Sequence, residues 1–246
     1  MSTVLCRPLP WDSEFFSRRI GRVVPSQLDA DDMSRVLAWA DAEQIDCLYF
    51  LADFSARDTI RLAEDNGFRL MDLRTLLDRS LRDELPAPEP DIRPWKPDDL
   101  PILRKVARVS YRDSRFYFDE RFPEAQCDAL YETWIEKSCS GYAEQVLVAE
   151  YQGAAAGYIS CHIRDGVGDI GLVGVDERAQ GRGLGRALVV ASLDWFKSQG
   201  LERVTVVTQG RNIPAQRLYQ RCGFMTRAVD LWYHRWFTTQ EDDLPR

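Results

Sequence analysis

Short apolar runs alternate with longer amphipathic stretches in the part of the chain that follows residue 90, a pattern typical of strands alternating with helices. The clearest amphipathic stretch begins at Leu184, and Leu188 and Trp195 continue its apolar face. The pattern predicts strands near Ile92 and at 145–151, 155–163, 169–175 and 203–208, with a last pair of strands within 225–237. It predicts helices at 98–109, 127–137 and 184–198, and from about residue 212 to 223.

A proline-rich stretch divides the chain. Pro86, Pro88 and Pro90 favour extended backbone, so we expect a linker at 86–90. This linker would separate an N-terminal α/β domain at 1–85, without a catalytic role, from a domain at 91–246 that carries the chemistry. The expected fold class is therefore α/β (α+β).

Two segments on either side of this linker are similar to one another. Residues 59–68 read TIRLAEDNGF and residues 215–224 read AQRLYQRCGF, so that Arg, Leu, Gly and Phe coincide at a constant offset. Either the first domain is a degenerate copy of part of the second, or both use a common helix–glycine–strand connection. Tyr219 is matched by Ala63, so only the second segment has a tyrosine at this position.

Composition narrows the class of protein. The chain has 246 residues, of which 45% are hydrophobic, enough for a packed core. No apolar run approaches the roughly 20 residues of a membrane span, and Arg7, Pro8 and Asp12 make the N-terminus unlike a signal peptide. The net charge of −7 argues against nucleic-acid binding. Six scattered cysteines and two histidines lead us to expect reduced thiols, no metal site and a cytoplasmic location.

A glycine-rich segment, RAQGRGLG at 178–185, follows an apolar run and leads into the amphipathic stretch. A strand, a glycine turn and a helix N-terminus in this order bring backbone N–H groups together, where the helix dipole favours a phosphate. Side chains at Gly181, Gly183 or Gly185 would hold a pyrophosphate away from the backbone. The segment lacks the Gly-Lys-Ser/Thr of a Walker loop, and its place in the chain does not suit a dinucleotide fingerprint. The alternative is a tight turn without a ligand.

A second candidate for chemistry lies on the helix that follows the strand at 203–208. Asn212 precedes Tyr219 by two helical turns, so both can present polar groups along one face. A phenol, with a reference pKa of about 10, can donate a proton to a departing thiolate. The alternatives are a packing role for Tyr219 and a helix-capping role for Asn212.

Together these two elements resemble the GCN5-related N-acetyltransferases (GNAT). The loop resembles the family's Gln/Arg-x-x-Gly-x-Gly/Ala at Gln180, Gly183 and Gly185. The stretch NIPAQRLYQRCGF, from Asn212, resembles its Asn-x-x-Ala/Ser-x-x-x-Tyr-x-x-x-Gly-Phe. The resemblance implies a mixed, largely antiparallel central sheet flanked by helices, with acetyl-CoA as cofactor. It also implies acetyl transfer to a primary amine by direct attack in a ternary complex.

The resemblance implies roles for individual residues. Tyr219 would be the catalytic proton donor. The strand before the loop would separate from its neighbour and pair with the pantetheine arm through its backbone, where Gly174 leaves clearance. The implied cofactor-binding residues are Leu172, Val173, Gly174, Val175, Gln180, Gly181, Arg182, Gly183, Leu184, Gly185, Asn212 and Tyr219.

The general base for the amine is the least defined part of the site. Some family members place a glutamate on the strand before the loop. Here the polar candidates are Asp169 at the start of that strand and His162 on the preceding strand. The unperturbed pKa of a histidine suits the task, and solvent acting through ordered water is a third route.

Two further stretches resemble a narrower family, the dTDP-fucosamine (dTDP-4-amino-4,6-dideoxygalactose) acetyltransferases. LPWDSEFF at 9–16 resembles that family's Leu-x-Trp-Asp/Glu-x-x-Phe-Phe-Gly, although Ser17 replaces the final glycine. SRF at 114–116 and the YETWI of 131–135 resemble its Ser-Arg-Phe and Tyr-x-x-Trp-Ile. With the cofactor motifs, the resemblance spans nearly the whole chain.

This narrower resemblance implies the 4-amino group of a dTDP-linked dideoxy sugar as acceptor. Arg112 and Arg115 would bind its phosphates, and aromatic side chains nearby would line its base or sugar. These aromatic residues are Tyr111, Phe116, Tyr117 and Phe118. The alternative for residues 111–118 is a loop packed on the core with solvated arginines. The alternative acceptors are a protein N-terminus, a polyamine, an antibiotic or an amino acid. The alternative function is that of a non-catalytic acyl-CoA-binding module. We expect a small-molecule partner, no nucleic acid or membrane, and consider a homodimer.

Overall fold

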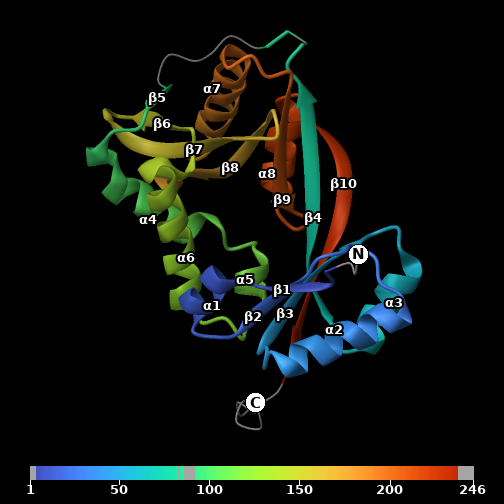
Figure 1. Ribbon diagram of the computed structural model, residues 1–246. Helices are drawn as coiled ribbons and strands as arrows, with labels where there is room; N and C mark the ends of the chain where they lie inside the picture. Colours follow the sequence, from blue (N-terminus) through green and yellow to red (C-terminus); the bar gives the residue numbers. More distant parts are fainter. Residues whose placement is uncertain (1–3, 83, 86–91, 238–246) are drawn as a thin grey trace. The chain divides into compact units, whose positions relative to one another are not determined.

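The computed structural model describes residues 4–82, 84–85 and 92–237 (Figure 1). Contacts between residues divide the chain into two compact units, here called the first and the second unit. The first unit comprises the residues up to 74, residues 118–122 and those from 229 onward, and the second comprises 75–117 and 123–228. The predicted linker at 86–90 lies outside the described residues.

The first unit packs helices against a mixed group of strands. Strand β2 runs parallel to β3, whereas β1 is antiparallel to β2 and β10 is antiparallel to β3. Leu48 and Phe50 of β3 alternate into a core that includes Met33 and Val36 of α2. The elements are β1 (Cys6–Pro8), α1 (Pro10–Phe16), β2 (Ile20–Val23), α2 (Ala30–Ala42), β3 (Cys47–Asp53) and α3 (Arg57–Asp65), with parts of β4 (Arg69–Ser80) and β10 (Met225–Trp236).

The N-terminal aromatic stretch of the first unit forms helix α1. Trp11 stacks on Phe15 with ring centres 5.1 Å apart, and Phe16 packs against Phe122 at 4.6 Å. The helix ends at Ser17 in the left-handed conformation, with φ 52° and ψ 40°. Glycine adopts this conformation most easily, so the glycine of the motif that residues 9–16 resemble would suit the position of Ser17.

The second unit is built on strands in the order β4, β9, β8, β7, β6, β5. Strands β5 to β8 pair antiparallel in succession, and β8 pairs parallel with β9. The elements are β5 (Ile92–Pro94), η1 (Pro97–Asp99), α4 (Leu100–Ser110), α5 (Arg115–Phe118, its last residue in the first unit), α6 (Glu124–Lys137), η2 (Ser138–Tyr142), β6 (Gln145–Tyr151), β7 (Ala154–Arg164), β8 (Val167–Val175), η3 (Glu177–Ala179), α7 (Leu184–Ser198), β9 (Arg203–Gln209) and α8 (Ile213–Arg221).

Alternating side chains of β7 face the two sides of this sheet. Ile159 joins the apolar core that Leu188 of α7 completes. Tyr158 lies on the other side, where a Cβ added to Gly174 would come within 3.0 Å of both Tyr158 and Val106 of α4. Helices therefore cover both sides, and the predicted mixed, largely antiparallel sheet flanked by helices is confirmed.

Most predicted elements are present, with one clear error. β6 and α7 have the predicted bounds, 145–151 and 184–198, and α4 begins two residues later than predicted. The prediction of a strand pair within 225–237 is wrong, because β10 is one continuous strand. The segment contains no glycine or proline, the residues that most often end a strand in a turn.

The two similar sequence segments lie in equivalent elements. β3, α3 and β4 correspond to β9, α8 and β10, and each bound differs by the same 156 residues, from Cys47 against Arg203 to Ser80 against Trp236. In both copies a parallel strand pair precedes the helix, β2 with β3 and β8 with β9. The shared element bounds favour a duplicated unit over a chance match.

The ends of the two equivalent helices are also alike. The N–H of Phe68 donates to the carbonyl of Ala63, and the N–H of Phe224 donates to that of Tyr219, both at 3.0 Å. Each helix is followed by a glycine with positive φ, 79° in the first copy and 82° in the second. This left-handed residue explains why glycine recurs before the phenylalanine.

The last strands of the two copies are exchanged. β3 pairs with Asp230–Trp236 of β10, and β4 is the neighbour of β9. β4 and β10 therefore each contribute residues to both units. This division differs from the predicted domains 1–85 and 91–246, because a boundary at one point along the chain cannot represent two exchanged strands.

Candidate active site

The candidate cofactor cleft begins where two parallel strands separate. β8 pairs with β9 at Gly168–Ile170, whereas its antiparallel pairing with β7 continues to Val175. Within these fully described strands, residues 172–175 have no strand partner on the β9 side; this is the open edge of β8. The residues expected to bind pantetheine, Leu172, Val173, Gly174 and Val175, form that edge.

A β-bulge lies at the point of separation. Ser160 of β7 faces two residues of β8, Gly171 and Leu172. The Oγ atom of Ser160 accepts a hydrogen bond of 2.8 Å from the N–H of Leu172 and lies 3.3 Å from Nε2 of His162. A Cβ at Gly171 would lie 2.6 Å from that nitrogen, so glycine is needed to make room for the imidazole.

The glycine-rich loop leads from the open edge into α7. Gly181 and Gly183 have φ values of 73° and 84°, and Gly183 is the N-cap of α7 with no side-chain cap. Beyond the neighbouring residues of the chain, no described atom lies within 4 Å of a Cβ built on either glycine. The first N–H groups of α7 are thus left for another acceptor, and the surrounding space is one that side chains would fill. The loop therefore fits the diphosphate of CoA.

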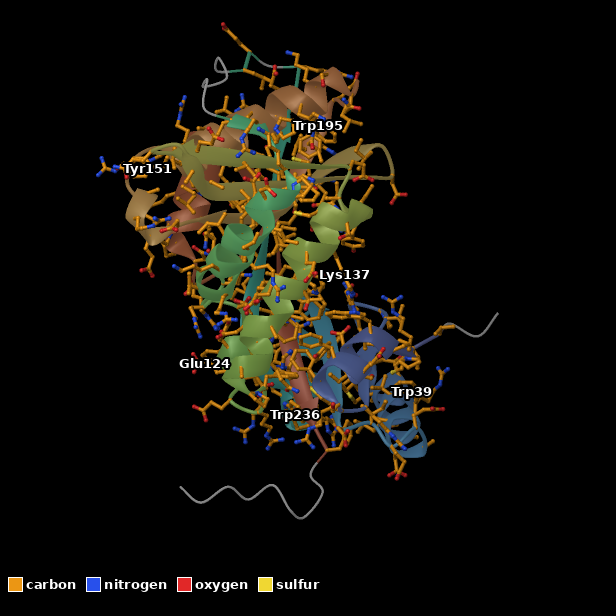
Figure 2. All side chains as sticks on the ribbon, turned by 90° about the vertical axis from the view of Figure 1, so that its left-hand side faces the viewer. Trp39, Glu124, Lys137, Tyr151, Trp195 and Trp236 are labelled. Atoms are coloured by element: carbon orange, nitrogen blue, oxygen red, sulfur yellow. The ribbon has the colours of Figure 1, made fainter. Side chains whose placement is uncertain are left out.

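The neighbours of the loop hold it against the strand and the next helix. The side-chain amide of Gln180 donates to the carbonyl of Val175 at 3.3 Å, which links the loop to the open edge. A Cβ at Gly185 would lie 3.3 Å from Leu218 of α8, so the start of α7, with Leu184, packs closely on that helix. Arg182 lies over the ring of Tyr151, labelled in Figure 2, at 5.1 Å.

Helix α8 presents the predicted proton donor. Asn212 is its N-cap, and the Oδ1 atom accepts a hydrogen bond of 3.0 Å from the N–H of Ala215. Tyr219 is 5% exposed and packs edge-on against Phe224. Within the described residues its hydroxyl makes no hydrogen bond, and burial raises the pKa of Tyr219, which keeps the phenol protonated.

The two candidate bases have different surroundings. His162 is 5% exposed, and burial, followed by the nearby Arg164, lowers its pKa. The imidazole is therefore neutral near neutral pH, as a base must be. Asp169 pairs with His162 across the strands and lies 3.4 Å from Arg164, and it also accepts a hydrogen bond from Thr205 at 3.3 Å.

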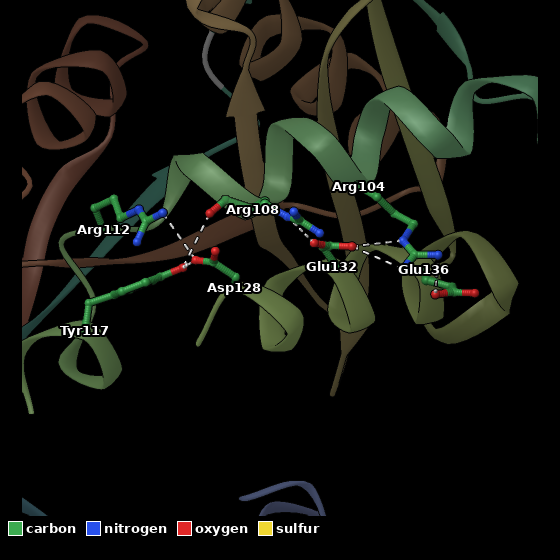
Figure 3. Close-up of polar contacts among 7 residues, drawn as sticks. All are labelled: Arg104, Arg108, Arg112, Tyr117, Asp128, Glu132 and Glu136. Atoms are coloured by element: carbon green, nitrogen blue, oxygen red, sulfur yellow. Dashed lines mark hydrogen bonds and ion pairs between the residues drawn. The ribbon is translucent and has the colours of Figure 1, made fainter. Parts of the chain in front are cut away.

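Arginines of α4 pair with glutamates of α6 (Figure 3). The residues involved, here called the charge ladder, are Arg104, Arg108, Glu132 and Glu136. Glu124 and Lys137 mark the ends of α6 in Figure 2. Arg104 and Arg108 both bind the carboxylate of Glu132, which is 7% exposed. Burial alone would raise the pKa of Glu132, but the two guanidinium groups hold it below its usual range. The ladder therefore joins the two helices by charge-assisted contacts between a buried carboxylate and two partly exposed guanidinium groups.

The residues expected to bind the acceptor lie at the end of this ladder. Arg112 lies 3.2 Å from Asp128 and 4.6 Å from the centre of the Tyr117 ring. The hydroxyl of Tyr117 donates to Asp128 at 2.7 Å. Arg115 lies 4.1 Å over the buried ring of Phe116. Arg112 is thus already engaged by two carboxylates, those of Glu124 and Asp128.

Sequence reasoning missed two residues of this region. Ser160 and Tyr158 alternate with apolar residues along β7 and point away from the α7 side, together with His162. The Tyr158 hydroxyl lies 2.9 Å from that of Tyr111. Polar residues at every second position of an otherwise apolar strand were the available signal.

No cysteine is placed as a nucleophile. All six cysteines are buried thiols outside any disulfide of the described residues. Cys222 lies one turn from Tyr219, and burial raises the pKa of its thiol.

In the described part of the chain, no group of three or more His, Cys, Asp or Glu residues that could hold a metal ion occurs. No described helix is both long and apolar enough to cross a membrane.

Comparison with known proteins agrees with this geometry. Residues 107–224 match the model of the Acetyltransferase (GNAT) family. A GCN5-related N-acetyltransferase from Sphaerobacter thermophilus has a similar structure, with a TM-score of 0.68 at 18% identity over 94% of this chain and 76% of that one. The chain therefore has the same fold as this N-acetyltransferase, and its segment 107–224 is similar to the Acetyltransferase (GNAT) family.

Two curated relatives are more similar to this chain in sequence than the Sphaerobacter protein is. The spore coat polysaccharide biosynthesis protein SpsD of Bacillus subtilis is 26% identical over 75% of this chain and 63% of its own length. A mycothiol acetyltransferase of Clavibacter michiganensis is 33% identical over 44% of this chain and 34% of its own length. The chain thus spans less than two thirds of these relatives.

Proposed function

We propose that this protein is an N-acetyltransferase that moves the acetyl group of acetyl-CoA to a primary amine. The separation of β8 from β9 after Ile170, beside an uncapped helix N-terminus, is the observation that carries the proposal. A strand edge without a partner can bind the two amides of pantetheine, and a helix N-terminus can bind the diphosphate. In this proposal Leu172–Val175 and Gln180–Gly185 hold the cofactor, with Asn212 and Tyr219 beside them.

The chemistry requires a proton donor and a proton acceptor. Bound acetyl-CoA supplies a thioester carbonyl that an amine can attack. Tyr219 gives its proton to the departing thiolate, for which its unbonded hydroxyl is available. His162 accepts the proton of the amine, since its lowered pKa keeps it neutral. Asp169 is the weaker candidate because Arg164 and Thr205 already bind its carboxylate.

Direct attack on the thioester is favoured over an acetyl-cysteine. Cys222 is the cysteine nearest in sequence to Tyr219, and it is 2% exposed. Its raised pKa keeps the thiol protonated, and a protonated thiol is a poor nucleophile. Both substrates would therefore be bound when the acetyl group moves.

The acceptor that we propose is the 4-amino group of a dTDP-linked 4-amino-4,6-dideoxy sugar. Support comes from the resemblance of residues 9–16 and 114–116 to enzymes of that specificity, and from the polysaccharide-related name of the relative SpsD. Arg115 would contact the diphosphate, with Phe116 and Tyr117 close by. Arg112 would do so only by sharing its guanidinium with Glu124 and Asp128.

A panel of acceptors tests the proposal. The purified protein is given acetyl-CoA with a dTDP-4-amino sugar, a polyamine, an amino acid or a peptide, and release of free thiol and product mass are measured. Arg115→Ala should raise the KM of the nucleotide sugar about 10- to 150-fold, the effect of losing a charge-assisted contact. The KM of acetyl-CoA should stay the same, and Arg57→Ala, an exposed arginine of α3, serves as control. Efficient turnover of another amine, with the nucleotide sugar ignored, would assign that amine instead.

A further inference from the structure

Two tyrosine hydroxyls, that of the half-buried Tyr111 and that of the buried Tyr158, lie together beside the open edge of β8. Tyr111 follows α4, Tyr158 lies in β7, and their hydroxyl oxygens are 2.9 Å apart. Tyr158 is 0% exposed, and the ring of Tyr111 stacks on that of Tyr131 with centres 4.3 Å apart. The two side chains, here called the phenol pair, are therefore held in place by packing.

The phenol pair carries one proton more than its own hydrogen bond uses. Two hydroxyl groups have two protons, and the bond between them uses one. Neither Tyr111 nor Tyr158 makes another side-chain hydrogen bond within the described residues. Polar groups that packing holds in place nearly always have a hydrogen-bond partner, so the remaining O–H is available to an oxygen of a bound ligand.

The position of the phenol pair indicates which ligand. A Cβ on Gly174 would lie 3.0 Å from Cε1 of Tyr158 and 3.1 Å from Oγ of Ser110, so the glycine allows Tyr158 to lie against the open edge. Burial raises the pKa of Tyr111, and its contact with Tyr158 adds to this, so the phenol stays protonated. The phenol pair thus lies against the strand edge that the proposed function assigns to the thioester.

One backbone donor at this cleft is already used. The N–H of Leu172, at the bulge, donates to Ser160. A carbonyl group bound at the open edge cannot receive that hydrogen bond, and acyl transfer needs donors at the oxygen where negative charge develops.

We propose that the remaining O–H of the phenol pair donates a hydrogen bond to the carbonyl oxygen of the acetyl thioester. This inference rests on the proposed function, since it takes residues 172–175 as the thioester site. As the carbon–nitrogen bond forms, negative charge grows on that oxygen and the hydrogen bond strengthens. The carbon–sulfur bond then breaks, and the sulfur takes the proton of Tyr219, while the phenol pair keeps both of its protons.

The double variant Tyr111→Phe/Tyr158→Phe tests the inference. Removing both hydroxyls leaves no orphan donor or acceptor and keeps both rings, so the fold should be retained. Calorimetry should show acetyl-CoA bound about 2- to 10-fold more weakly, the effect of one hydrogen bond, with the affinity for CoA unchanged. The carbonyl stretch of bound ¹³C-acetyl-CoA should move to higher frequency, and kcat should fall about 10²- to 10³-fold.

A control and the remaining outcomes separate this inference from the proposed function. Tyr233→Phe also removes a buried phenol hydroxyl, which donates to Glu64 at 3.0 Å in the first unit, and should change none of these readouts. An unchanged affinity ratio and carbonyl frequency in the folded double variant would overturn the inference, as would a loss confined to the KM of the acceptor amine. If the unaltered protein binds neither CoA nor acetyl-CoA, the proposed function itself fails.

Discussion

The hydroxyl of Ser160 lies 3.3 Å from Nε2 of His162 while it accepts the N–H of Leu172. Because the oxygen already accepts one hydrogen bond, its own proton is available to the imidazole nitrogen. This arrangement suits a neutral His162 and agrees with the direction of its pKa, which burial and then Arg164 lower. Ser160 thus connects the bulge of β8 with the proposed base.

We predict that His162→Gln lowers kcat/KM about 10²- to 10⁴-fold, the usual contribution of a general base. In the unaltered protein, activity should fall as the pH drops through a value below about 6.5, the reference for histidine, because the pKa of His162 is lowered. The measurement is a pH profile with two acceptor amines of different basicity. If the pH at which activity falls shifts with the pKa of the acceptor amine and persists in His162→Gln, solvent rather than His162 takes the proton of the amine. Asp169→Asn is the matched control.

A valine at Gly183 should block the diphosphate site. Its φ of 84° and open surroundings are shared by Gly200, with φ 77°, at the other end of α7. Both Gly183→Val and Gly200→Val place a side chain in left-handed backbone, which costs about 1–3 kcal/mol. Calorimetry should show CoA affinity reduced at least about tenfold, or roughly 1.4 kcal/mol, in Gly183→Val alone. Equal affinities in the two folded variants would remove the loop from the cofactor site.

Local pattern was sufficient to predict most of the second unit. Short apolar runs and the turns between them define β6, β7 and β8, and the helical period defines α7, because each depends on neighbours in sequence. The exchange of β4 and β10 depends instead on which strand edges meet. The sequence of residues 225–236 would suit a strand beside either β3 or β9, so it does not reveal the partner. Pairing between residues 189 positions apart, such as Cys47 with Trp236, leaves no local signal in the sequence.

The candidate site was predictable to a different extent on its two sides. The cofactor side is formed by backbone with positive φ, a conformation that favours glycine, so Gly181 and Gly183 indicated it in the sequence. The acceptor side depends on side chains that meet only after folding. The contact of Arg112 with Asp128, and that of Tyr111 with Tyr158, join different elements and have no fixed spacing in sequence.

Tyr219→Phe should separate catalysis from packing. The hydroxyl makes no hydrogen bond within the described residues, so its removal should leave the thermal midpoint and the affinity for CoA nearly unchanged. If the phenol is the proton donor, kcat should fall about 10²- to 10⁴-fold. Stopped-flow measurement of thiol release, beside calorimetry with CoA, makes the comparison. A parallel loss of rate and CoA affinity would mark Tyr219 as a packing residue.

The carboxylate of Asp119 joins residues 118–122 to the end of β10. Its Oδ2 atom lies 2.6 Å from Nδ1 of His234 and accepts a hydrogen bond of 2.9 Å from the indole of Trp236. Asp119 is 5% exposed; burial would raise its pKa, but His234 and then Trp236 hold it below its usual value. These contacts explain why the short segment 118–122 belongs to the first unit.

Asp119→Ala should destabilise the first unit by about 3–5 kcal/mol, because it leaves His234 and Trp236 without their buried acceptor. Glu120→Ala, at the exposed neighbouring position, should change stability by no more than about 0.5 kcal/mol. Since the folded pKa of Asp119 is lowered, its contribution is present above the unfolded value of about 3.9 and is lost as the pH falls toward the folded value. Urea unfolding followed by tryptophan fluorescence at neutral pH and near pH 3 measures both effects. If Asp119→Ala unfolds at the same urea concentration as Glu120→Ala, the buried carboxylate does not hold this segment.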